Sequence, residues 1–104
     1  MNLITSQHYI DDATVEAKRA ARDYAVLVSP AITVDGETYH NIIDGNHSYQ
    51  AAMIDGADPV ITIATVQDDD KVQMLVEGDV DGYLEAAYHD DIYIHADTRR
   101  PVWG

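Results

Sequence analysis

The spacing of hydrophobic positions changes several times along this chain, and each change marks the border of a predicted element. Residues 12–24 follow the spacing of a helix, because Ala17, Ala20, Ala21 and Tyr24 recur at intervals of three and four. These four side chains therefore share one face. The pattern predicts a helix over residues 12–24, with this face turned inward.

Short apolar segments typical of strands follow the helix. Residues 25–28 (AVLV) are a strand candidate, and Pro30 then limits the chain to a sheet edge or a turn. Hydrophobic and polar residues alternate from Ile32, and Asp35-Gly36 is a strong signal for a type I′ turn. We expect a hairpin whose second strand covers residues 38–43.

A strand, a tight turn, a helix and a second strand are predicted over residues 41–63. The helix covers about 46–55, with Tyr49, Ala52 and Met53 on one face, and Gly56 suits its end. The next segment, 60–66 (VITIATV), is rich in β-branched residues. This composition favours a central position in the sheet.

The last third of the chain has weaker periodicity. Residues 71–77 are ambiguous between strand and helix, whereas residues 79–90 indicate a helix. Its expected inward residues are Val80, Leu84, Ala87 and Tyr88. Residues 91–97 alternate as a strand, with Ile92 and Ile94 on one face. The tail has no period, and Pro101 and Trp103 either fold back on the core or anchor a partner.

Helices and strands are thus mixed around one small sheet, which predicts the α+β (mixed α/β) class. The 104 residues show no repeat or linker and suit one domain, 1–104. No run of 18 apolar residues is present, so we expect no membrane contact, and the start lacks the pattern of a signal peptide. The absence of cysteine excludes disulfides and thiol chemistry and fits a cytoplasmic location.

Charge changes the picture most. Nineteen acids face six bases, and residues 23–98 hold 16 acids and one base, Lys71. Such a surface repels phosphate backbones, so we expect no direct nucleic-acid binding. One interpretation is solubility alone. The other is an acidic surface that attracts a protein partner with a basic surface, including proteins that normally hold nucleic acid.

The candidate chemistry lies in the turn DGNHS, residues 44–48. Gly45 permits unusual backbone angles, and the following helix start offers unpaired N–H groups to an anion. Asp44 can hold a metal ion or take a proton, His47 can act as acid or base, and Ser48 can donate a hydrogen bond. Ordinary turn and capping chemistry, with Asn46 or Ser48 as the cap, explains the same residues.

The order of elements around IIDGNHSYQAA resembles the ParB/sulfiredoxin superfamily, whose turn and helix are often written DGxHRxxA. Asp44, Gly45, His47 and Ala51 fit that motif, and the resemblance covers roughly residues 12–65. It implies a nucleotide-phosphate site at Gly45, Asn46, His47 and Ser48, with ATP or CTP and Mg²⁺ as cofactors. An enzyme of this kind, a phosphotransferase or hydrolase, would use Asp44, His47 and Ser48 in catalysis.

This sequence departs from the family pattern at one position that matters. Ser48 stands where the motif has arginine, and a serine cannot replace the charge that grips phosphate. No Arg or Lys lies within twenty residues of Ser48 on either side, and the cysteine of sulfiredoxin chemistry is missing. We therefore expect a retained fold whose ancestral chemistry is weakened or lost, unless a subfamily uses Ser here.

Two further acidic clusters are candidates for partner binding: Asp68, Asp69 and Asp70, and Asp90 with Asp91. The first cluster fails the calcium-loop pattern, because Gln73 stands where a glycine is required. Near the second, Asp91, His95 and His89 have the residue types of metal ligands, although an exposed polar face explains them equally well. We predict no bound metal.

Three functions remain open from sequence. The first is a small acidic inhibitor that binds a nucleic-acid-handling protein without a cofactor, with the composition of phage and plasmid anti-defence proteins. The second is the nucleotide-dependent enzyme described above. The third is an accessory module that mediates dimerisation only.

Overall fold

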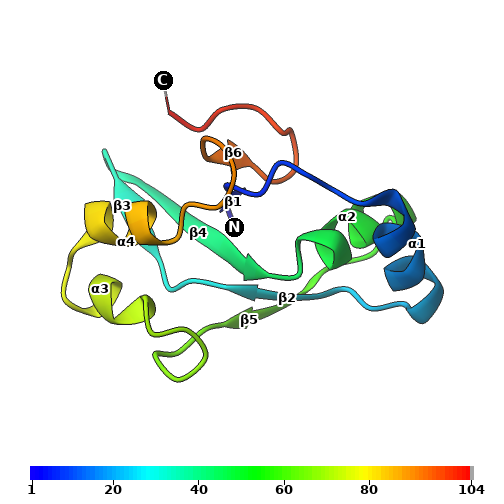
Figure 1. Cartoon of the computed structure of the whole chain (residues 1–104), viewed down its shortest axis with the longest axis horizontal. Coiled ribbons are helices and arrows are strands. Elements are labelled where there is room, and N and C mark those ends of the chain that lie inside the picture. The colour runs from blue at the N-terminus through cyan, green and yellow to red at the C-terminus, as the bar shows by residue number, and fades with distance from the viewer. Residues whose placement is uncertain (104) are drawn as a thin grey trace.

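The computed structural model of the chain describes residues 1–103 and shows a mixed sheet with helices near both of its ends (Figure 1). The elements are β1 Leu3–Thr5, α1 Asp12–Ala21, β2 Ala25–Val28, β3 Ile32–Val34, β4 Glu37–Asp44, α2 Asn46–Asp55, β5 Val60–Ile63, α3 Val72–Val76, α4 Val80–Ala86 and β6 Ile94–His95. The predicted α+β class is confirmed.

The six strands are ordered β5-β2-β4-β1-β6, and β3 pairs with β4 beside this path. Strand β2 runs parallel to β5 and antiparallel to β4. Strand β1 runs parallel to β4 and antiparallel to β6, so the beginning and the end of the chain meet at one edge. Helices α1 and α2 lie at one end of the molecule, and α3 and α4 at the other (Figure 1).

The predicted hairpin is present as β3 and β4. Asp35 has φ 51° and Gly36 has φ 82°, so both central turn residues are left-handed, as a type I′ turn requires. The predicted strand 25–28 and the predicted helix 46–55 are also present with those bounds. Gly56 ends the helix in the left-handed conformation, as expected.

Two small hydrophobic cores share strand β4, because its alternate side chains point to opposite faces of the sheet. Tyr39 belongs to the core that α3, α4 and the tail cover. Ile42 belongs to the core that contains Tyr49 of α2. Trp103 folds back on the first core, as one of the two predictions for the tail had it, and meets the rings of Tyr39 and Tyr93 edge-on.

The first helix differs from its prediction in length and in face. It ends at Ala21, because Arg22 adopts a left-handed conformation and closes the last turn. Ala17, Ala20 and Ala21 are exposed, and Val15 is the buried residue of α1. Alanine buries too little area to decide which face packs, so the larger Val15 determines the inward face of α1.

The strand after Pro59 lies at the edge of the sheet and not at its centre. Strand β5 pairs only with β2 among the described strands, and Val60 and Ile63 are 62% and 45% exposed. The β-branched run gave no information about the number of neighbours, because such residues suit edge and central strands alike. The ambiguous segment 71–77 contains a helix, α3.

The C-terminal predictions were wrong in detail. Helix α4 stops at Ala86, so Tyr88 leaves the helical register and is 51% exposed, whereas Tyr83 is fully buried. Strand β6 has two residues, and Ile92 is half exposed while Tyr93 is buried. Met53 of α2, which was expected to face inward, is 43% exposed. Across residues 1–103, no helix is both long enough and apolar enough to span a bilayer.

Candidate functional site

The turn at residues 44–48 joins β4 to α2, and Gly45 is the residue that makes the turn possible. Gly45 has φ 100° and precedes the helix without capping it through a side chain. A Cβ atom at this position would lie 2.4 Å from the carbonyl oxygen of Ala25 in β2. Only glycine therefore allows α2 to begin this close to the neighbouring strand.

Helix α1 lies parallel to α2 and is attached to it at both ends. The main-chain N–H of Asp11, before α1, donates to His47 Nε2 at 3.1 Å. At the other end, Arg19 Nε donates to an Asp55 carboxylate oxygen at 2.7 Å. Because an N–H can only donate, the neutral His47 ring carries its proton on Nδ1. His47 thus connects the two helices.

The position of the family arginine is occupied by a buried serine. Ser48 is 2% exposed, and its hydroxyl lies near the Asp23 carboxylate. Lys18 Nζ donates to the same carboxylate at 3.0 Å. The pKa of Asp23 lies below its usual value, first because of this bond and to a smaller extent because of Ser48. Ser48 therefore lies beside an ion pair whose two side chains are each 38% exposed.

The three candidate catalytic residues do not form a catalytic triad. Within the described chain, no hydrogen bond joins Asp44, His47 or Ser48 to one another, and Asp44 is exposed at the end of β4. His47 Nε2 is not free to serve as the general base for Ser48, since it accepts from Asp11, and the carboxylate beside Ser48, Asp23, is paired with Lys18. Among the described residues, the arrangement therefore lacks the serine–histidine contact that a triad of these three residues would need.

A small hollow nevertheless opens at the start of α2. Its volume is about 130 Å³, and its lining includes the predicted residues Asp44, Gly45, Asn46, His47 and Ser48, together with Gln7, Ile43 and Lys18. Lys18 comes from α1, thirty positions before Ser48, and no local pattern predicted its presence here. The hollow thus combines a helix N-terminus with one cation, although Asp23 already neutralises that cation.

The acidic loop after β5 is ordered by its own carboxylates. An Asp68 oxygen accepts the main-chain N–H of Thr65 at 2.8 Å, and Asp69 pairs with Lys71 at 3.0 Å. Asp70 is exposed and makes no ion pair among the described residues. Of the three predicted partner-binding residues in this loop, Asp70 is the one whose carboxylate is least engaged.

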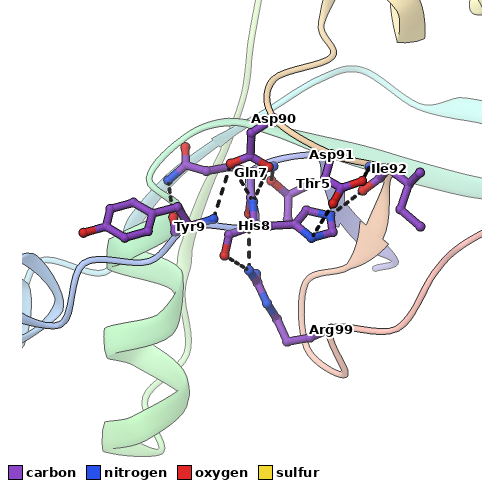
Figure 2. Close-up of polar contacts among 8 residues, drawn as sticks. All are labelled: Thr5, Gln7, His8, Tyr9, Asp90, Asp91, Ile92 and Arg99. Carbon is purple, nitrogen blue, oxygen red and sulfur yellow. Dashed lines mark hydrogen bonds and ion pairs between the residues drawn. The ribbon is translucent and has the colours of Figure 1, made fainter.

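The second acidic cluster holds the segment after β1 in place (Figure 2). Both Asp90 oxygens accept the N–H of His8, at 2.9 and 3.1 Å, and one also accepts from Tyr9 at 3.3 Å. These bonds lower the pKa of Asp90, and the His8 N–H contributes most. On the other side of this segment, Arg99 donates to the carbonyl oxygens of Gln7 and His8.

Asp91 is the other exposed carboxylate of this cluster. One of its oxygens accepts from its neighbour Ile92 at 2.8 Å, and the other lies 3.9 Å from His8 Nδ1. His89 and His95 do not join it in a metal site: over residues 1–103, no three acidic or histidine side chains come together in an arrangement that could hold an ion. The cluster shapes the loop between β1 and α1.

A polar cavity of about 320 Å³ lies between the loop that carries Asp69 and Lys71 and the end of α4. Asn41 of β4 is 4% exposed and lines this cavity. Its amide donates to the Tyr83 hydroxyl at 3.1 Å, whereas its oxygen has no partner within the described chain. Asn41 was not predicted, because an isolated polar residue in a strand gives no signal of burial.

Charges are distributed unevenly over the surface. All acids except Asp11, Asp23 and Asp69 are exposed. We define the acidic end as the exposed carboxylates of the β3–β4 hairpin, the loop after β5, α3 and α4: Asp35, Glu37, Asp68, Asp70, Glu77, Asp79, Asp81 and Glu85. Lys71 is the one base in this region, and it is paired.

Most of the positive charge is engaged within the molecule. Lys18, Arg19 and Lys71 form ion pairs, and Arg99 donates to main-chain oxygens. Arg22 and Arg100 remain as exposed bases. Few bases are therefore free to offset the exposed carboxylates at the surface.

The fold and the charge together define an acidic α+β domain with a small hollow at a strand–turn–helix junction. Comparison with protein-family models, with curated proteins and with solved structures gives no match. The resemblance to the ParB/sulfiredoxin superfamily therefore stays a prediction.

Proposed function

We propose that this protein acts by binding a protein partner through its acidic end. The partner is a nucleic-acid-handling protein, and the carboxylates occupy the places where phosphates of its nucleic acid normally lie. A phage or other mobile element would use such a protein to inhibit a host defence. No cofactor is required.

The observation that carries this proposal is the segregation of charge. Eight exposed carboxylates lie at the end formed by the β3–β4 hairpin, α3 and α4, and the single base there is neutralised by Asp69. A charged surface of one sign raises the association rate with a surface of the opposite sign. The attraction depends on ionic strength, as it does for nucleic acid itself.

The test is a pull-down from a bacterial lysate at low and at raised salt, followed by competition. A captured protein must lose its bound DNA or RNA when the acidic protein is added. The variant Glu77→Gln, Asp81→Asn, Glu85→Gln removes three charges from the acidic end. Exposed pairs contribute about 0.2–1 kcal/mol each, so for three pairs we expect affinity to fall roughly 3- to 150-fold.

A matched control removes three charges elsewhere: Asp12→Asn, Glu16→Gln, Asp97→Asn. This variant has the same net charge as the first, and its changes lie in α1 and in the loop after β6. Equal losses for the two variants would show non-specific attraction and reject the acidic end as a binding site. Recovery of no nucleic-acid-binding protein, or capture that salt does not weaken, would reject the function.

A second candidate function is nucleotide binding at the start of α2, and Lys18 is the observation that favours it. Lys18 lines the hollow with Gly45, His47 and Ser48, so a cation is present although the motif arginine is missing. Calorimetry with ATP and with CTP, each with and without Mg²⁺, tests this candidate. Heat of binding that Lys18→Ala removes would support it, whereas no heat and no thermal shift would exclude it.

A further inference from the structure

Strand β5 leaves one edge of the sheet open. Its four residues, Val60–Ile63, contain no lysine, proline or bulge of the kind that usually protects an edge. No helix packs closely along it among the described residues. In Figure 1 the strand lies at the lower border of the molecule, beyond β2.

The opposite edge of the sheet, formed by β6, is protected against further strand pairing. Strand β6 has two residues, and the chain returns so that Pro101 forms a bridge with Ile94. A short strand and a proline are two of the devices that prevent further pairing. The contrast shows that the tail covers one edge of this sheet and leaves the other uncovered.

The hydrogen bonds define which groups β5 offers to solvent. The N–H of Val60 donates to Tyr24, and the N–H of Ala64 donates to Val28, both toward β2. Because the direction alternates along a strand, the N–H and C=O groups of Ile61 and Ile63 point away from the sheet. An added strand would pair with these two residues.

The chemistry around the edge indicates the kind of strand that fits. Val60 and Ile63 offer exposed apolar side chains on opposite faces of β5. Asp58 precedes the strand, and Asp68 is bonded to Thr65 just after it, so carboxylates flank both ends. The strand itself is roughly 13 Å long at the usual rise per residue.

We propose that the edge of β5 binds an extended peptide segment of a basic partner as an additional strand. The segment has apolar residues in its middle and Lys or Arg at its ends, where Asp58 and Asp68 lie. A second copy of this chain is the less suitable occupant, because each copy carries a net charge of −13 and repels the other. The inference depends on the proposed function in one respect, namely that the partner is positively charged.

The probe is the capped hexapeptide acetyl-KVTVTK-amide, added to the full-length ¹⁵N-labelled protein. We expect saturable shifts of the amide resonances of Ile61 and Ile63. Two N-methylated peptides, methylated at alternate residues, separate strand pairing from general charge attraction. Methylation of the peptide N–H groups that face β5 should weaken binding about tenfold, because it removes hydrogen bonds to the strand. Methylation of the N–H groups on the other edge of the peptide should leave binding nearly unchanged.

Variants of the protein complete the test. Ile63→Pro removes an N–H that points away from the sheet and keeps the hydrogen bonds between β5 and β2. We expect this variant to bind the peptide about tenfold more weakly. Asp58→Asn should lower the affinity for the hexapeptide more than the control Asp12→Asn does. A peptide with Glu in place of both Lys residues should bind more weakly than the original peptide.

Three results would overturn the inference: equal effects of the two methylation patterns, resonance shifts confined to residues outside β5, or a dimer in sedimentation that Ile63→Pro dissociates. The acidic end and the edge of β5 share Asp68, but the outcome does not depend on the helical carboxylates, because the variant Glu77→Gln, Asp81→Asn, Glu85→Gln should still bind the hexapeptide. Loss of partner binding in that variant, with the peptide still bound, would separate the two surfaces.

Discussion

Replacement of Gly45 by alanine tests whether the turn before α2 has the tight geometry described above. The left-handed conformation of Gly45, with φ 100°, costs an L-residue about 1–2 kcal/mol. The new Cβ would also lie 2.4 Å from the carbonyl oxygen of Ala25 and 3.0 Å from the Cα of Val26. Both atoms are main chain, so the strand itself must move.

Overpacking of this kind costs typically 1–3 kcal/mol, which brings the expected loss for Gly45→Ala to about 2–5 kcal/mol. Gly36→Ala is the matched control. Gly36 has φ 82°, but no atom lies within 4 Å of the position of its Cβ. The control therefore pays for backbone strain alone, about 1–2 kcal/mol.

Urea unfolding measures the difference. Trp103 is the only tryptophan and packs on Tyr39 and Tyr93, so its fluorescence reports on the folded state. We expect a lower midpoint for Gly45→Ala than for Gly36→Ala, with unchanged slope. Each kcal/mol corresponds to about 4–8 °C in the melting temperature of a domain near this size. Equal midpoints for the two variants would refute the close approach of turn and strand.

Three more predictions concern buried groups and the helix contact. Burial raises the pKa of Tyr93 to about 12, while an unfolded tyrosine ionises near pH 10. The unfolded chain therefore loses its proton first, and the Tyr93 contribution, about 2–3 kcal/mol and complete below pH 10, should disappear between pH 10 and 12. Tyr93→Phe should flatten this alkaline loss in pH-dependent unfolding, and an unaltered pH profile would contradict the assignment. Tyr83→Phe leaves the Asn41 amide without its one partner and should cost about 1–3 kcal/mol. The double variant with Asn41→Leu should recover part of that loss, so additive losses in a denaturant series would argue against the pairing. His47→Ala removes the acceptor for Asp11 and should lower stability by about 1 kcal/mol, while His89→Ala, at an exposed position, should leave the melting temperature unchanged. A similar effect of both histidine changes would contradict the structural role of His47.

Local signals predicted the elements that depend on backbone preference. Asp35-Gly36 defined the hairpin, because few residue pairs adopt two successive left-handed conformations. Gly56 defined the end of α2 for the same reason. The elements that failed, such as the face of α1, depend on which neighbour a side chain meets, and this is not encoded in the spacing of a single segment.

In the candidate site, too, local sequence predicted some features and tertiary contacts decided the others. Asp44, Gly45, His47 and Ser48 were found together because they are adjacent in sequence. Lys18 and Asp23 are only five residues apart, but the position of their ion pair beside Ser48 was not predicted, because it requires α1 to pack on α2, about thirty residues away. Such a contact follows from the order of strands in the sheet, which a short motif does not specify.

The sequence by itself determined the fold class, the hairpin, the second helix and the excess of acidic residues, since each follows from local conformational preference or from composition. The tertiary structure decided how those acids are placed. It pairs three of the six bases with acids, gathers exposed carboxylates at the end formed by α3, α4 and the β3–β4 hairpin, and leaves β5 at an open edge. These outcomes depend on long-range packing, which brings together residues that no periodic pattern connects.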